Sequence, residues 1–165
     1  MSHAPILTHD EIQHTIRRIA YQIYETFPDE TSIVIAGIAP NGYVFAEKIA
    51  EVLEQISPLV VTRCKVEMDK KNPLAPIRTS LAPDAYAGKG LVLADDVLNS
   101  GATLIYGVRH FLEVPLKKFK TAVLVDRNHK QYPVKVDFKG ISLSTSLQEH
   151  VEVVFDENAS TVVLS

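Results

Sequence analysis

Two acidic residues followed by a run of small polar residues form the segment of this sequence best suited to chemistry. Asp95 and Asp96 come directly after the apolar run 91–94, and a helical pattern starts near Gly101. Backbone N–H groups at the start of a helix carry about half a positive charge and favour phosphate groups. We therefore expect a phosphate to bind the intervening turn, which consists of Asn99, Ser100, Gly101, Ala102 and Thr103.

The two carboxylates suit either the neighbouring hydroxyls of a sugar or a hydrated Mg²⁺ ion, which prefers oxygen ligands. Together with a phosphate turn, they predict a site for ribose 5-phosphate. A plainer interpretation is that Asp95 and Asp96 only signal a turn and that residues 99–101 only cap a helix. We favour the site because all of its parts follow one strand in the required order.

The apolar pattern predicts the elements that would position this site. Thr8 and Glu11 form a capping box for a helix that ends near Phe27. Apolar runs without alternation predict buried strands, and stripes at helical spacing predict helices between them. The predicted strands cover residues 32–36, 59–64, 91–94 and 121–125, the two further helices lie within 45–56 and 101–112, and a terminal hairpin joins 151–155 to 161–164.

This order predicts a three-layer α/β fold with a mainly parallel sheet, built as a single domain over residues 1–165. Ligands of such sheets bind beyond the carboxyl ends of the strands. Two irregular segments should lie there. One is a loop over 37–42, and the other is the proline-containing stretch 69–89, named here the flap segment.

At this point the sequence resembles a known family. Residues 91–103 are similar to the 13-residue motif with which type I phosphoribosyltransferases bind phosphoribosyl pyrophosphate (PRPP). Residues 125–129, 132–133 and 140–146 resemble one branch, the bifunctional pyrimidine-operon attenuation proteins with uracil phosphoribosyltransferase activity.

The resemblance implies a role for each part. Asp95 and Asp96 would bind the ribose hydroxyls, with Mg²⁺ bridging these and pyrophosphate, and residues 99–103 would hold the 5-phosphate. Val125 and Arg127 would line the nucleobase end. The resemblance also implies a mobile flap and a homodimer. The expected pyrophosphate loop consists of Gly37, Ile38, Ala39, Pro40, Asn41 and Gly42.

This chain departs from the family pattern where positive charge is expected. Family members commonly place Arg or Lys inside the pyrophosphate loop, whereas Pro40 and Asn41 stand there in this chain. The cations available in the flap segment are Lys70, Lys71 and Arg78, and the sequence does not show which of them reaches pyrophosphate. Positioned charge is usually a large contribution to catalysis, so the departure bears on rate more than on ligand binding.

Several other classes of protein are disfavoured. The spacing of Gly37 and Gly42 matches a P-loop, but Tyr43 and Val44 follow in place of Lys and Ser/Thr. The six histidines show no metal-ligand spacing. The single cysteine, Cys64, favours a cytoplasmic setting, and no signal peptide or membrane span is expected.

Three functions remain open. The first is transfer of ribose 5-phosphate from PRPP to uracil, with Mg²⁺. The second is a non-catalytic regulator that senses a nucleotide and binds RNA, although the net charge of −3 does not favour RNA. The third is transfer to a purine base.

Overall fold

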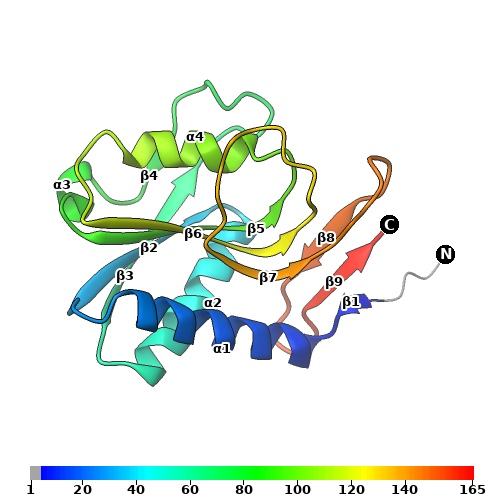
Figure 1. Ribbon diagram of the computed structural model, residues 1–165, viewed down its shortest axis with the longest axis horizontal. Coiled ribbons are helices and arrows are strands. Elements are labelled where there is room, and N and C mark those ends of the chain that lie inside the picture. The colour runs from blue at the N-terminus through cyan, green and yellow to red at the C-terminus, as the bar shows by residue number, and fades with distance from the viewer. Residues whose placement is uncertain (1–4) are drawn as a thin grey trace.

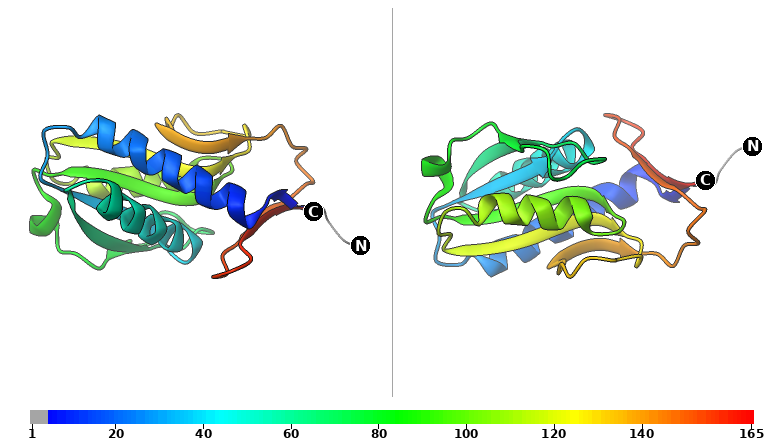
Figure 2. Two further views of the ribbon diagram at one scale, coloured as in Figure 1. Left: turned by 90° about the horizontal axis from the view of Figure 1, so that it is seen from below. Right: turned by 90° about the horizontal axis from the view of Figure 1, so that it is seen from above.

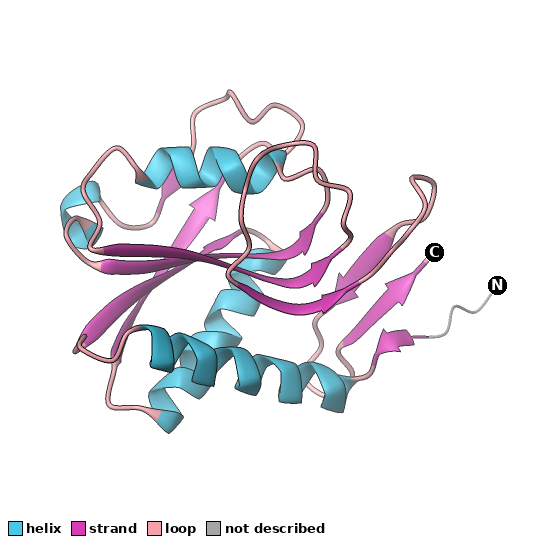
Figure 3. Cartoon of the chain, in the orientation of Figure 1, coloured by secondary structure: helices cyan, strands magenta, loops and turns pink. Residues whose placement is uncertain are grey.

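A sheet of six strands forms the centre of the computed structural model, which describes residues 5–165 (Figures 1 and 3). The strand order is β4-β3-β2-β5-β6-β7; β4 runs antiparallel to β3, and the other neighbours are parallel. The strands are β2 (Ser32–Ile38), β3 (Val60–Glu67), β4 (Arg78–Thr79), β5 (Gly90–Leu98), β6 (Lys118–Asp126) and β7 (Phe138–Ser142).

Helices cover both faces of this sheet and confirm the predicted three-layer α/β class. Helices α1 (His9–Thr26) and α2 (Asn41–Ile56) pack together on one face, and α4 (Ala102–Phe111) lies on the other (Figure 2). The short helix α3 (Pro83–Tyr86) precedes β5. Each face has its own cluster of buried apolar side chains, so the β2 and β5 backbones are covered on both sides.

Helix α1 has the capping box that its sequence predicts. The Thr8 hydroxyl accepts from the Glu11 backbone N–H at 3.3 Å, and the Glu11 carboxylate accepts from the Thr8 N–H at 3.2 Å. Its apolar stripe, Ile12, Ile16, Ile19, Ala20 and Ile23, is buried. The helix ends before Phe27, as expected.

The predicted terminal hairpin is also present. Strands β8 (Val151–Val154) and β9 (Thr161–Leu164) pair antiparallel, and β1 (Pro5–Leu7), which the sequence did not indicate, adds to β9. This small sheet lies beyond the carboxyl ends of the central strands (Figure 1). It can therefore cover that edge of the molecule.

The central strands extend further than the apolar runs indicate. Strand β5 continues through Asp95 and Asp96 to Leu98, and Asp95 is in register with Val123 of β6. The acidic pair thus belongs to the strand. Pairing with β2 ends at Ala94, and pairing with β6 carries the strand on to Leu98, so polar side chains do not stop a strand whose backbone still has a partner.

The expected loop over 37–42 is wrong in extent. Gly37 and Ile38 pair with β3, and Asn41 and Gly42 already belong to α2, which leaves a connection of Ala39 and Pro40, joined by a cis peptide bond. The flap segment is also partly regular, because β4 and α3 lie within it.

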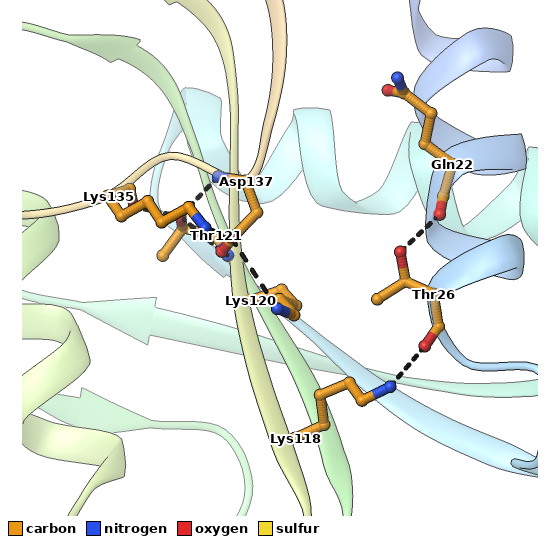
Figure 4. A network of polar contacts seen from close by, with 7 residues as sticks. All are labelled: Gln22, Thr26, Lys118, Lys120, Thr121, Lys135 and Asp137. Atoms are coloured by element: carbon orange, nitrogen blue, oxygen red, sulfur yellow. Dashed lines mark hydrogen bonds and ion pairs between the residues drawn. The ribbon is translucent and has the colours of Figure 1, made fainter.

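The β6–β7 connection (residues 127–137) is fixed to the sheet by polar contacts (Figure 4). The Thr121 hydroxyl donates to the Lys135 carbonyl at 2.5 Å, and its backbone N–H donates to Asp137 at 3.0 Å. Lys120 and Lys135 form ion pairs with Asp137. These contacts fix the position of the β6–β7 connection, which also contacts the candidate site.

Among residues 5–165 there is no helix whose length and apolar content would let it cross a membrane.

Gly37 tests the tightness of the β2–α2 connection. A Cβ at this position would lie 2.5 Å from the Gly42 carbonyl oxygen and from the Tyr43 Cα, which are backbone atoms. We expect Gly37→Ala to lower the free energy of unfolding by about 1–3 kcal/mol, measured by urea denaturation. Gly107→Ala is the control, because its Cβ would meet the ends of the Leu93 and Ile38 side chains rather than backbone, and alanine favours the helix. Equal effects of the two substitutions would contradict the close contact.

Candidate active site

The acidic pair lies at the carboxyl end of β5, and its two members differ in environment. Asp95 is only 4% exposed, whereas Asp96 is half-buried. The Asp95 carboxylate accepts from the Asp96 backbone N–H at 2.9 Å, and the Asp96 carboxylate accepts from the Val97 N–H at 2.9 Å. The side-chain ammonium of Lys70, from the flap segment, lies 3.5 Å from Asp95 Oδ1.

Burial raises the pKa of Asp95 well above its ordinary value, and the negative charge of Asp96 adds to this effect. Lys70 acts in the opposite direction without cancelling it. The ionised form of Asp95 is therefore costly in the folded chain. A ligand that donates hydrogen bonds or brings positive charge would relieve this cost.

The turn over 99–103 leads directly into the start of α4. Gly101 has φ +90°, a conformation that favours glycine, and α4 begins at the next residue. The Ser100 hydroxyl accepts from the Ala102 N–H at 3.2 Å. The Ser100 carbonyl accepts from the backbone N–H groups of Gln131 and Tyr132, so the β6–β7 connection supports the turn from outside.

A cavity of about 210 Å³ joins the turn to the acidic pair. Its lining residues are Lys70, Asp95, Asp96, Val97, Leu98, Asn99, Ser100, Gly101, Thr103, Leu104, Val123 and Val151. Pockets for drug-sized ligands measure about 300–1,000 Å³. The smaller volume and the polar lining suit a sugar phosphate.

The start of α2 packs beside this cavity without lining it. A Cβ on Gly42 would lie 2.8 Å from Asp95 Oδ1, so only glycine lets α2 approach the carboxylate this closely. The Asn41 amide donates to the Val153 carbonyl at 2.9 Å. The β2–α2 connection is thereby joined to both the acidic pair and the terminal hairpin.

Arg127 has a role that its position in the sequence does not reveal. Its side chain is buried and does not line the cavity. The guanidinium donates to Asn99 Oδ1 at 2.8 Å and to Thr145 Oγ1 at 3.0 Å. It also donates to the carbonyls of Ser146 and Glu149, at 3.1 and 2.6 Å. Arg127 thus links the turn over 99–103 to the β7–β8 connection (residues 143–150).

Four other expected site residues do not line the cavity, and Ala102 of the turn is one of them. The Val125 side chain is fully buried in the apolar cluster that underlies α1 and α2. Lys71 is exposed on the flap segment, and Arg78 is exposed on β4 at the edge of the sheet. Of the three expected flap cations, Lys70 alone lines the cavity.

Sequence reasoning missed contacts that span long stretches of chain. The Asn41–Val153 and Arg127–Glu149 bonds join residues far apart in the sequence, and Val123 and Val151 reach the cavity from other strands. The signal for the hairpin was a pair of apolar runs, 151–155 and 161–164, on either side of residues 156–160. No local pattern in the sequence indicates which side chains the hairpin contacts.

The donor set fits Mg²⁺ only in part. Two adjacent carboxylates are hard oxygen donors, but within residues 5–165 no group of three acidic, histidine or cysteine side chains could hold a metal ion. Mg²⁺ commonly uses one or two carboxylates together with water and substrate phosphates. Asp95 and Asp96 would suffice for such a site.

A conserved-domain comparison agrees with this geometry: residues 4–158 match the family model described as phosphoribosyl transferase domain. The chain therefore belongs to the phosphoribosyltransferase family. Since the match covers most of the chain, the resemblance of residues 91–103 is confirmed as membership.

The relatives identify the nearer branch. A bifunctional protein PyrR from Streptomyces coelicolor is 32% identical over 97% of this chain and 88% of its own length. The bifunctional protein PyrR of a Picosynechococcus species is 33% identical over 92% of this chain and 90% of its own length.

Solved structures share the fold at low identity. A hypoxanthine phosphoribosyltransferase from Trypanosoma cruzi, complexed with the product IMP, has a TM-score of 0.80 at 16% identity and covers 99% of this chain and 85% of its own. A hypoxanthine-guanine phosphoribosyltransferase from Bacillus anthracis has a TM-score of 0.70 at 19% identity, covering 86% and 83%. At these identities, the likeness shows the fold alone.

Asp95→Asn should stabilise the protein at neutral and higher pH. Because the folded chain raises the pKa of Asp95, it binds this proton more tightly than the unfolded chain, and stability falls as pH rises through the raised pKa. Asparagine keeps an oxygen acceptor for the Asp96 N–H but cannot ionise. We expect a higher urea midpoint for Asp95→Asn at about pH 8 and a shrinking difference toward about pH 4. Asp29→Asn, which removes an exposed charge, controls for net charge. A lower midpoint for Asp95→Asn at about pH 8 would contradict a costly carboxylate.

Arg127→Met should loosen the β7–β8 connection. It removes four hydrogen bonds from a charged donor, and because Asn99 and Ser146 are exposed, water can replace some of them, so the cost should be about 1–3 kcal/mol. Hydrogen exchange at residues 145–149 should accelerate. For Arg127→Lys, which keeps the charge but has fewer donors, the exchange rate should lie between those of the parent and of Arg127→Met. Unchanged exchange in Arg127→Met would show that Arg127 does not hold this segment.

Proposed function

We propose that this protein transfers the ribose 5-phosphate group of PRPP to uracil and releases pyrophosphate. The observation that supports this most strongly is the single cavity lined by both Asp95–Asp96 and the turn at 99–103. One end can accept hydrogen bonds from ribose hydroxyls, and the other can donate backbone N–H groups to the 5-phosphate. Membership of the phosphoribosyltransferase family supports the same reaction class.

Positioning is the main task of the protein in this reaction. The bond between C1 of the ribose and pyrophosphate breaks as a ring nitrogen of the base bonds to C1, through an oxocarbenium-like state, and the proton on that nitrogen passes to water or to the released pyrophosphate. No side chain needs to act as a nucleophile. Asp95 and Asp96 would hold the sugar, and Ser100, Gly101 and Thr103 would fix its phosphate. Mg²⁺, if held at the acidic pair, would offset the negative charge of the leaving group.

Uracil is proposed as the base because the relatives over nearly the full chain are PyrR proteins. Hypoxanthine is the competing base, since it is the one named for the structures that share the fold. The side chains that would contact a base are the least defined part of the site. Val125 cannot do so from its buried position, and Arg127 is occupied by the β7–β8 connection.

A second candidate is a regulator that binds nucleotide and RNA without catalysis. It is favoured by the β2–α2 connection, where Ala39 and Pro40 provide no cation for the leaving group. The homodimer and the cytoplasmic setting stay predictions.

A base panel separates these functions. With PRPP and Mg²⁺, uracil should yield UMP and pyrophosphate, whereas hypoxanthine and guanine should yield far less product. Chromatography measures the nucleotide formed in each case. Asp96→Asn should lower kcat/KM about 10²-fold, the usual scale for a positioned polar group. Product from hypoxanthine alone would favour the purine enzyme. Ligand binding without any product would favour the regulator.

A further inference from the structure

Lys70 occupies an unexpected position for a flap residue. Its ammonium lies 3.5 Å from Asp95 Oδ1 and lines the cavity, although its side chain remains 40% exposed. The partner carboxylate side chain is only 5% exposed. Lys70 therefore reaches the acid from the solvent side and covers it.

A tight backbone turn next to Lys70 positions its side chain. The Asp69 carboxylate accepts from the backbone N–H groups of Lys71 and Asn72, at 2.9 and 3.3 Å, which closes a tight turn at the end of β3. Asp69 is thus held by the turn, and the next side chain, Lys70, extends to Asp95. Lys71 stays exposed.

The ammonium lies against Asp95 Oδ1, so a ribose hydroxyl or a divalent cation that binds this oxygen has to displace it. The Lys70 side chain is partly exposed to solvent and lines the same cavity, so it can stay at the site once displaced. The β2–α2 connection supplies no cation there, and Lys70 is the positively charged side chain among the described residues that line the cavity.

We propose, on the basis of the proposed function, that Lys70 is a placeholder cation. It pairs with Asp95 while the cavity lacks ligand, yields the carboxylate to the ribose and its divalent cation, and then binds the pyrophosphate of PRPP. One side chain thus opposes binding of the sugar phosphate and favours binding of the pyrophosphate. These two effects have opposite signs and can be measured separately.

Calorimetry of Lys70→Gln with two ligands tests this, each in the presence of Mg²⁺. Ribose 5-phosphate carries no pyrophosphate, so loss of the competing ammonium should lower its Kd about three- to tenfold. PRPP loses a charged partner, so its Kd should rise about tenfold or more. Lys70→Arg should restore PRPP affinity toward that of the parent.

Lys118→Gln is the matched control. Lys118 lies at the start of β6, at the opposite end of the sheet from the cavity, where its ammonium donates to the Thr26 carbonyl (Figure 4). Lys118→Gln removes the same charge as Lys70→Gln. Its Kd values for ribose 5-phosphate and PRPP should stay within about twofold of the parent, since distant surface charges are screened. Urea midpoints of all variants show whether each is folded.

The remaining outcomes overturn the placeholder role. Weaker binding of both ligands by folded Lys70→Gln would show a structural role, and tighter binding of both would show that Lys70 only blocks the cavity. Unchanged binding of both would show that the contact with Asp95 has no consequence. If the parent binds neither ligand, the proposed function fails together with this inference; if the parent binds both and the variant shows no split, the inference alone fails.

Discussion

A carboxylate buried at the end of a parallel strand is the constraint on which the site depends. Removing a charged group from water is costly unless it is paired or hydrogen-bonded. Asp95 accepts one backbone hydrogen bond and faces Lys70, but burial still dominates its pKa. The fold thus holds Asp95 in a state that a ligand with hydroxyl groups or positive charge can improve.

The surroundings of Asp95 explain why neighbouring elements take their particular form. Helix α2 can begin beside the carboxylate because Gly42 has no side chain, and Gly37 lets the chain turn back within two residues. The resulting connection consists of Ala39 and Pro40 and carries no basic side chain. Positive charge at the cavity comes instead from Lys70 of the flap segment.

Two long-range polar contacts join the segments that surround the site at the carboxyl ends of the strands. Asn41 joins the start of α2 to β8, and Arg127 joins the turn over 99–103 to the β7–β8 connection. Both the turn and the terminal hairpin therefore depend on side chains from other parts of the chain. A ligand that orders the turn at Asn99 would affect the same hydrogen bonds of Arg127 that hold the β7–β8 connection.

Local physical chemistry explains what could be predicted from the sequence. The α1 capping box, the buried strands and helices, the terminal hairpin and the acid-turn motif all depend on residues within a few positions of one another. Their periodicity is produced by the geometry of a single element, so it is visible in one stretch of sequence. The order of these elements was enough to predict a three-layer α/β fold.

Tertiary structure alone decided which side chains meet. It extended β5 through the acidic pair, reduced the expected 37–42 loop to Ala39 and Pro40, and turned Arg127 toward residues 145–149. It also separated Lys70 from Lys71 and Arg78, three cations that are equivalent in the sequence. The sequence determined the elements and the phosphate motif because short-range spacing encodes them. The partner of each charged side chain depends on segments brought together by packing, and local spacing carries no record of that.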